Sequence, residues 1–413
     1  MAELEKPDIA EVRRQLAEAE AKTSAADPGL VPMLNAMAKA LADHGRLDEA
    51  QTNLDRVLTL QMTATGPDSL ETAAALNSLA INHCLQYRYY EAIPLFERAL
   101  EIRRNLLGQG HPEVARLLNN IGSLYTSLGE YQRSEEYLDQ ALTIYQTHGL
   151  GDGESAFKAL NNLTGLYKET GRNGKAEETA RRVFEMAGRL FGQEHPVFAT
   201  VLNNLAEACA VNHKEAQAQE LVLQGIALKR KQSEDHPELA VYLNNLADIY
   251  QRQDMFVEAE AAYREAMGLG TRVLGHSHPL VGLSHLGLGS MFALGQDVAR
   301  AEAEYQAAMR ILERAWGPDH PDVAMIQYQY GNMLLDENKL EQAESLFQSA
   351  LRTLERAYGQ RHPKVRDVLG KLSQSALELG KADEAMAYLR RMQELGGAAQ
   401  AESGGHTETA HEA

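Results

Sequence analysis

The sequence predicts an all-α solenoid, a stack of about nine helical hairpins. Three observations predict it: a repeated dipeptide, helical periodicity within each repeat, and a turn residue at one fixed position. His-Pro recurs at successive intervals of 84, 41, 42, 42 and 42 residues, at His111, His195, His236, His278, His320 and His362. Extending this 42-residue period along the chain gives repeats starting near residues 27, 69, 111, 153, 195, 236, 278, 320 and 362. A fixed period of this length is typical of solenoids, whose repeats bury their apolar faces only against neighbouring repeats.

Each repeat carries the apolar spacing of two helices. In the third repeat, helix spacing relates Val114, Leu117, Leu118, Ile121 and Tyr125. After a break at Gly129, the same spacing relates Tyr137, Leu138, Ala141 and Leu142. The proline of each His-Pro suits the first turn of a helix, where its missing N–H would be unpaired. We therefore expect two antiparallel helices in each repeat.

The break between the two helices falls at one position of the repeat. Helices commonly end with a residue in the left-handed conformation, which Gly, Asn, Asp and His tolerate best. Residues of these kinds occupy that position in seven repeats: Gly45, Gly129, Gly171, His213, Asp254, Asn338 and Gly380. In another repeat the position holds Gln296, which follows a glycine. Only Tyr87 departs from the pattern.

Small residues recur where neighbouring helices must approach closely. In the first helices they are Ala38, Ala80, Gly122, Ala206, Ala247, Gly289 and Gly331. Larger residues of the second helices lie between them, among them Phe96, Leu138, Tyr263, Tyr305 and Phe347. This is the pattern of the tetratricopeptide repeat, whose usual length is about 34 residues. The additional residues, about two helical turns, are expected in the second helix and its exit loop.

Four segments carry a closer resemblance: NNIGSLY, NNLADIY, FERALEIRRNLLGQGHP and FQSALRTLERAYGQRHP. With their 42-residue period, they resemble the tetratricopeptide domain of kinesin light chains and its bacterial relatives, over roughly residues 28 to 396. The resemblance implies a right-handed α-solenoid that serves as a scaffold or adaptor for a protein or peptide partner. No long heptad region precedes the repeats, so a coiled coil with a kinesin heavy chain is not expected.

The ends of the chain differ from the repeats. Residues 1–27 are expected to form a capping helix and linker, in which Asp8 and Glu11 resemble a capping box. Residues 28–396 form the predicted solenoid, and residues 397–413, which are small, polar and acidic, are expected to be disordered. The glycine-rich junction at residues 149–153 lacks His-Pro, and a hinge or only a looser loop would explain it.

Two rows of asparagine mark the first helices. One row contains Asn35, Asn77, Asn119, Asn161, Asn203 and Asn244, and a second, one residue further on, contains Asn120, Asn162, Asn204 and Asn245. Asparagine is a mediocre helix former, so its recurrence needs a reason. In the proteins that this chain resembles, the first helices face the concave groove. An amide both donates and accepts hydrogen bonds, so these residues are candidates to bind the backbone of an extended peptide.

A second interpretation of these rows stays open, in which the asparagines bridge neighbouring helices. Neighbouring first helices are expected to lie about 8–10 Å apart, and an extended peptide rises about 3.3 Å per residue. If the asparagines bind such a peptide, successive amides would therefore meet every third peptide residue. Polar residues at neighbouring positions would then line side-chain pockets: Arg116, Lys158, Ser123, Thr126 and Lys168 in repeats three and four, and Glu207, Asp248, Gln251 and Arg252 further on.

The last three repeats lack the asparagines. Apolar residues occupy the inner positions instead: Leu283, Leu286, Leu294, Met325, Tyr328 and Leu335. They suggest an alternative function, a structural scaffold that self-associates through this face. Burial of these residues against the C-terminal repeats would explain them equally well.

Other features exclude whole classes of function. With 40 basic and 58 acidic residues the net charge is −18, which argues against nucleic-acid binding. No apolar run suits a signal peptide or a membrane span, so we expect a cytoplasmic protein without membrane insertion. Cys84 and Cys209 lack CxxC partners, and His276 and His278 lack a third ligand at suitable spacing, so no metal or other cofactor is expected. No catalytic or nucleotide-binding motif occurs, and we expect no enzyme.

Overall fold

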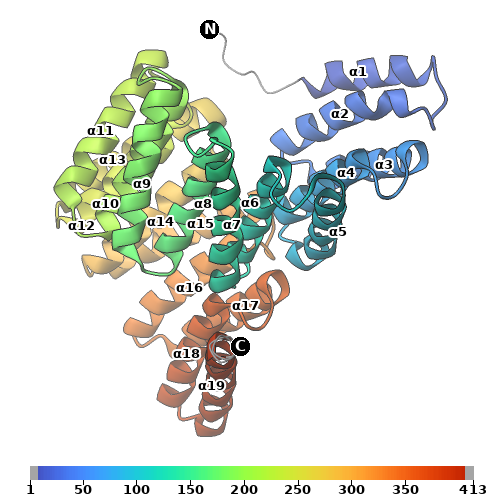
Figure 1. The fold of residues 1–413 in the computed structure, drawn as a ribbon. Helices are drawn as coiled ribbons and strands as arrows, with labels where there is room; N and C mark the ends of the chain where they lie inside the picture. The colour runs from blue at the N-terminus through green and yellow to red at the C-terminus, as the bar shows by residue number, and fades with distance from the viewer. Residues whose placement is uncertain (1–7, 405–413) are drawn as a thin grey trace, which may run out of the picture. The chain divides into compact units, whose positions relative to one another are not determined.

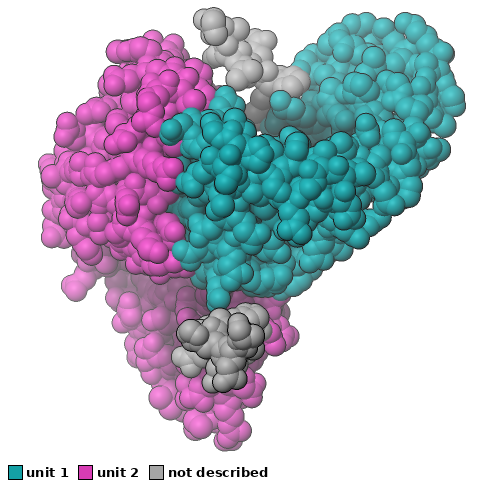
Figure 2. Space-filling model, in the orientation of Figure 1, with its two compact units in different colours: residues 1–166 teal, residues 167–413 magenta. Residues whose placement is uncertain are grey.

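The computed structural model describes residues 8–404, which form helices and no strands (Figure 1). From α2 onward the helices follow one another as antiparallel hairpins, as the period predicts. The chain divides into two compact units, which Figure 2 shows in teal and magenta: residues 1–166, the N-terminal unit, and residues 167–413, the C-terminal unit. The division falls inside α8 (Glu154–Glu169) and not at the glycine-rich junction.

The N-terminal unit begins with α1 (Ile9–Glu20) and a short 3-10 helix, η1 (Pro28–Leu30). The hairpins that follow pair α2 (Val31–Asp43) with α3 (Leu47–Thr65), α4 (Leu70–Leu85) with α5 (Tyr89–Leu107), and α6 (Pro112–Ser127) with α7 (Tyr131–Thr147). Leu16 of α1 is buried in one apolar cluster with residues of α2 and α3, and Ile9 and Val12 pack against it. The predicted N-terminal helix therefore covers the first hairpin.

The C-terminal unit begins with the last residues of α8, which precede α9 (Asn173–Leu190). The hairpins that follow pair α10 (Pro196–Val211) with α11 (Glu215–Gln232), α12 (Leu239–Arg252) with α13 (Phe256–Leu274), α14 (Pro279–Leu294) with α15 (Val298–Trp316), α16 (Pro321–Asp336) with α17 (Leu340–Tyr358), and α18 (Pro363–Glu378) with α19 (Ala382–Gly404). The second helices from α3 to α17 have 17–19 residues, whereas the first helices from α4 to α18 have 14–16. The additional residues therefore lengthen the second helices, as predicted.

The histidines of five His-Pro pairs cap the helices that follow them, and His236 makes the same hydrogen bond just before α12, whose N-cap is Glu238. At each site the histidine Nδ1 accepts a hydrogen bond of 3.1–3.2 Å from the backbone N–H two residues further on. Aromatic residues at the end of the preceding helix stack on three of these rings, with centroids 4.5–5.2 Å apart, as Trp316 does on His320. Trp316 is thus a packing residue between hairpins.

The predicted break positions all adopt the left-handed conformation. Gly45, Gly129, Gly171 and Gly380 have φ between 66° and 76°. The non-glycine positions, including the exception Tyr87, have φ between 58° and 60°. At the sixth break the left-handed residue is Gln296, and its glycine neighbour has an ordinary negative φ. The hairpin geometry therefore holds even where the side chain disfavours it.

Close approach explains the small residues of the first helices. A Cβ added at Gly122 would lie 2.7 Å from Leu138, and one added at Gly331 would lie 2.6 Å from Phe347. Such distances are too short for carbon atoms in contact. Each large residue of a second helix therefore fits against a small residue of its partner, as the sequence pattern predicts.

Ion pairs that the sequence analysis did not predict join second helices of successive hairpins in the C-terminal unit. A glutamate of one second helix binds a lysine 37 residues later, just before the next second helix begins. The pairs are Glu177–Lys214, Glu302–Lys339 and Glu344–Lys381, with N–O distances of 2.6–2.8 Å. Glu177 and Glu344 are buried.

Two expectations about the ends are wrong in part. Asp8 caps α1 by accepting from the N–H of Ala10, but Glu11 binds Arg14 and Gln15 and does not complete a capping box. Helix α19 extends to Gly404, so residues 397–404 are not disordered as expected. The rest of the predicted tail lies outside the described residues.

Candidate functional site

The asparagine rows in the N-terminal unit are joined across successive hairpins. Asn120 of α6 donates through Nδ2 to Oδ1 of Asn77 in α4, at 2.9 Å. Asn162 of α8 donates in the same way to Asn119 of α6, also at 2.9 Å. A second-row residue therefore bonds to the first-row residue of the preceding hairpin. We call each such pair an amide rung.

The C-terminal unit contains a third amide rung with an acidic partner. Asn245 of α12 donates to Asn203 of α10 at 2.9 Å and to Oε1 of Glu207 at 3.0 Å. Asn203 also donates to Glu207 at 3.0 Å, and the other carboxylate oxygen of Glu207 pairs with Lys168 at 2.5 Å. This network neutralises the charge of Glu207 within the protein.

The bridging interpretation is thus confirmed for three pairs, while ligand binding stays a prediction. Asn120 and Asn162 each use one N–H in a rung, which leaves a second N–H and the carbonyl oxygen. Both side chains are half-buried, whereas the first-row residues Asn119 and Asn203 are buried. The second row is therefore the more accessible one.

The remaining predicted asparagines lie outside these rungs. Asn161 donates to the carbonyl of Phe157 at 3.2 Å, and Asn244 accepts from the hydroxyl of Ser284 at 2.9 Å. Asn204 is half-buried on α10, and Asn35 is exposed on α2.

The predicted polar residues beside the rungs are only partly available. Arg116 and Lys158 are exposed one turn before Asn120 and Asn162, on the same helix faces, and Arg116 pairs with Glu113 at 2.5 Å. Lys168 is held by Glu207, and the hydroxyl of Thr126 lies 2.7 Å from that of Ser134. Of the predicted basic residues, Lys158 and Arg252 are those for which no ion pair is found among the described residues.

A cavity of about 340 Å³ adjoins the rung of the C-terminal unit. Residues of α12, α14 and α16 line it, together with the ring of Tyr263 from α13; they include Asn244, Asn245, Asp248, Leu283, Leu286 and Gln329. The hydroxyl of Tyr263 donates to Asp248. Burial and the adjacent Asp248 carboxylate raise the pKa of Tyr263, so its hydroxyl keeps the proton that it donates.

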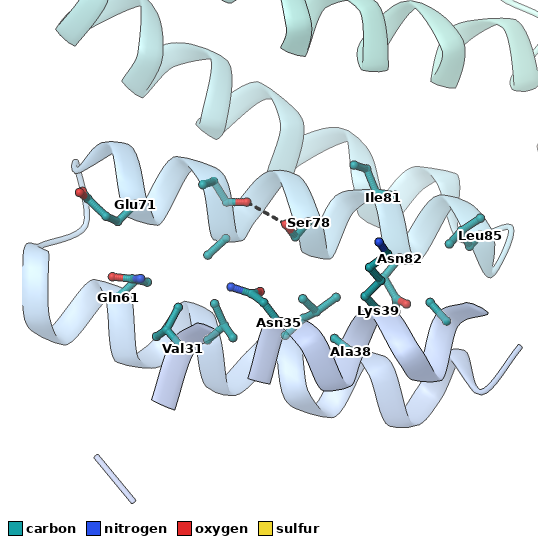
Figure 3. A pocket seen from close by; sticks show the side chains of 15 residues that line it. Val31, Asn35, Ala38, Lys39, Gln61, Glu71, Ser78, Ile81, Asn82 and Leu85 are labelled. Atoms are coloured by element: carbon teal, nitrogen blue, oxygen red, sulfur yellow. Dashed lines mark hydrogen bonds between the residues drawn. The ribbon is translucent and has the colours of Figure 1, made fainter. Parts of the chain in front are cut away.

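A second cavity, of about 460 Å³, lies in the N-terminal unit between α2 and α4 above α3 (Figure 3). Its walls are mostly small or aliphatic, and Asn35, Lys39 and Asn82 add polar groups. Asn82 is 3% exposed and donates to the carbonyl of Leu47 at 3.1 Å, but no hydrogen-bond partner of its Oδ1 is found within residues 8–404. The sequence analysis missed this cavity, which the facing small residues Ala38, Ala74 and Ala75 could have indicated.

The apolar inner positions of the last repeats differ in their exposure. Leu335 is buried, which agrees with the second of the two explanations left open for these residues, and Leu283, Leu286, Met325 and Tyr328 are half-buried. Only Leu294 is largely exposed, at 63%. Burial therefore explains much of the pattern that suggested self-association.

Two kinds of feature are absent from the described residues. No helix within residues 8–404 is long and apolar enough to cross a membrane. In the same part of the chain, no three His, Cys, Asp or Glu side chains lie close enough together to hold a metal ion.

Comparison with known families identifies repeats over most of the chain. A tetratricopeptide-repeat model matches residues 73–147, 197–269, 238–314, 281–356 and 322–395. Two other tetratricopeptide-repeat models match residues 158–197 and 35–106. No curated protein gives a significant match.

Several solved structures match the chain at low sequence identity. BtubC (BKLC) from P. vanneervenii is 17% identical, with a TM-score of 0.46 over 59% of this chain and 94% of BtubC. A putative kinesin light chain from Podosopora anserina, with nearly identical TPR-like repeats, is 22% identical, with a TM-score of 0.42 over 50% of this chain and 98% of the other. A Rap protein complexed with Competence and Sporulation Factor is 14% identical, with a TM-score of 0.49 over 95% and 99% of the two chains.

Proposed function

Since the chain belongs to the tetratricopeptide-repeat family, whose stacked hairpins form protein-interaction scaffolds, we propose that its first helices bind an extended peptide segment of a partner protein. The second-row residues Asn120, Asn162, Asn204 and Asn245 bind the peptide backbone. The observation that carries this proposal is the set of amide rungs, because each rung fixes a side-chain amide and leaves part of its hydrogen-bonding capacity unused.

The rungs supply preorganisation. An amide already held by a neighbouring helix loses little side-chain entropy when it binds a ligand, and reducing this loss favours binding. Asn120 and Asn162 can offer the peptide both an N–H and a carbonyl oxygen. Asn245 uses its amide hydrogens on Asn203 and Glu207, so it offers the peptide its carbonyl oxygen.

Backbone contacts alone are insufficient for stable binding. Each hydrogen bond contributes about 0.5–1.5 kcal/mol net, whereas association costs an estimated 4–15 kcal/mol. Side chains of the peptide must therefore add contacts in cavities beside the rungs. The cavity that adjoins Asn245 provides such a place in the C-terminal unit.

The N-terminal unit offers a matched pair of variants for testing the proposal. Asn120→Ala with Asn162→Ala removes the second-row amides, and Asn77→Ala with Asn119→Ala removes their first-row partners. Both double variants abolish the same two inter-hairpin hydrogen bonds. A difference between them in peptide affinity therefore reports contacts with the ligand and not the loss of the rungs.

The probe is a peptide selected on the wild-type chain from a phage-displayed library of random dodecapeptides, with affinity measured by fluorescence anisotropy. Two lost hydrogen bonds predict that the second-row variant binds about 5- to 150-fold more weakly. The first-row variant loses only the preorganisation that the rungs supply, so it should be weakened less than the second-row variant. Equal weakening in both variants would show that the rungs act only through the fold, and failure to select any peptide would reject the proposal.

Self-association is the alternative, and the exposed side chain of Leu294 is the observation that favours it. Light scattering over a range of protein concentrations separates the two functions. The peptide-binding proposal predicts a mass of one chain throughout. A mass that rises with concentration in the wild type, and not in Leu294→Ser, would favour the alternative.

A further inference from the structure

The cavity beside Asn245 has an unusual distribution of charge. Of its lining residues, Asp248 alone has a carboxyl group; desolvation of that group raises the pKa of Asp248, and the hydrogen bond from Tyr263 opposes this effect. Its carboxylate accepts a hydrogen bond from Tyr263, and no ion pair with Asp248 is found within residues 8–404. Arg252, exposed one helical turn further along α12, acts on Asp248 electrostatically and lowers its pKa, but no ion pair between the two is found within residues 8–404. The nearby Glu207, in contrast, is already paired with Lys168.

The position of Tyr263 depends on a glycine in the facing helix. A Cβ added at Gly287 would lie 2.2 Å from Cε1 and 2.6 Å from Cζ of the Tyr263 ring. Gly287 therefore lets the ring cross beneath α14 so that its hydroxyl reaches Asp248. A neutral phenol hydroxyl orients the carboxylate without neutralising it, so the negative charge remains available to a ligand.

Apolar groups line the cavity beside this carboxylate, and Asp248 itself is exposed. Leu280, Leu283 and Leu286 of α14 are half-buried and line the same cavity. Such walls suit the methylene stem of a long cationic side chain, which packs on apolar surface while its charged head reaches a polar group. The carbonyl oxygens of Asn245 and Gln329, which also line the cavity, can accept further hydrogen bonds from that head.

We propose that this cavity binds a lysine or arginine side chain of the peptide, with its cationic head on Asp248. The inference rests on the proposed function and specifies the chemistry of the partner. An acidic side chain would place two negative charges together, and an aliphatic one would leave the carboxylate without a cation. The net charge of −18 favours the approach of a basic segment through long-range attraction.

The test combines a substitution of Asp248 in the protein with a substitution of the basic residue in the peptide. Asp248→Asn removes the charge but keeps an oxygen that can accept from Tyr263. Glu258→Gln is the matched control, because Glu258 is exposed on α13 of the same hairpin and does not line the cavity. The probe is the peptide selected from the dodecapeptide library, synthesised with its basic residue and with methionine at that position.

The proposal predicts that the selected peptides share a lysine or arginine at one position. Replacing it with methionine should weaken binding to the wild type about 10-fold or more. Asp248→Asn should weaken the basic peptide by a similar factor and leave the methionine peptide nearly unchanged, so the two changes are not additive. Glu258→Gln should have no such effect, and Asp248→Lys should select peptides with an acidic residue at that position.

Two failures are distinguishable. Selected peptides without a shared basic position, or equal effects of Asp248→Asn on both peptides, would overturn the inference while the proposed function stands. If no peptide binds the wild type, both fail. Circular dichroism melting checks that Asp248→Asn folds, and if it does not, the wild-type comparison of the basic and methionine peptides decides.

Discussion

The buried carboxylate of Glu177 gives a quantitative prediction about stability. Glu177 lies on α9 and is 4% exposed. Burial disfavours its ionised form, but hydrogen bonds from Lys214, Asn212 and Arg181 outweigh this effect and lower the pKa of Glu177 to about 2. Their lengths are 2.6–2.7 Å. The ordinary pKa of a glutamate is 4.5, so ionised Glu177 stabilises the folded state.

The sign and the size follow from this difference in pKa. A carboxylate whose pKa is lower in the folded state stabilises the fold above its unfolded pKa, and the stabilisation is lost as the pH falls towards the folded pKa. A difference of about 2.5 pKa units corresponds to about 3 kcal/mol at most. Between pH 7 and pH 3, proton linkage with these two pKa values removes about 2 kcal/mol of it.

The assay is urea unfolding followed by circular dichroism at pH 7 and pH 3. Glu177→Gln cannot titrate at this position, so the wild type should lose about 2 kcal/mol more than this variant between the two pH values. The exposed neighbour Glu178 provides the control, because Glu178→Gln should track the wild type. Equal losses in the wild type and in Glu177→Gln would refute the reasoning.

Three further predictions concern turns, packing and caps. Gly129 has a φ of 73°, so Gly129→Ala should lower the free energy of unfolding in urea by about 1–2 kcal/mol. Gly110 has an ordinary φ and open space around it, so Gly110→Ala should be nearly neutral. Equal effects of the two substitutions would contradict the assignment of strain. Gly331→Ala places a Cβ 2.6 Å from Phe347 and should destabilise by about 1–3 kcal/mol, an expectation that an unchanged thermal midpoint would reject. Burial lowers the pKa of His320, against the opposing charge of Asp322, so its neutral cap contributes most above pH ~6.5 and is lost as the pH falls through the lowered pKa. His320→Asn, which caps without titrating, should therefore lose less stability than the wild type between pH 7.5 and pH 5, and parallel losses would argue against the cap.

The hairpin fold could be predicted because local rules repeat along the chain. His-Pro marked the starts of helices, and the left-handed turn position recurred at a fixed place in each repeat. The role of the histidine ring as a cap was not predicted, because it depends on the orientation of a side chain that the spacing does not reveal. Tyr87 adopts the turn conformation although its side chain disfavours it, since the packing of both flanking helices fixes the backbone there.

The candidate site could be predicted only in part. The sequence placed the two asparagine rows on the first helices, but which amide bonds to which depends on the offset between neighbouring hairpins. The ion pairs of the second helices and the cavity at Asn82 depend on the same offset and were missed. For Leu335 the sequence left a contact face and burial equally open, and burial is the one that the structure shows.

The most direct test of the proposed function observes the asparagine side chains during binding. In nuclear magnetic resonance spectra of ¹⁵N-labelled protein, the side-chain NH₂ groups of Asn120 and Asn162 can be followed as a library-selected peptide is added. The proposal predicts that both signals shift with saturation while those of Asn77 and Asn119 change far less. Saturable binding that leaves the signals of Asn120 and Asn162 unmoved would contradict it.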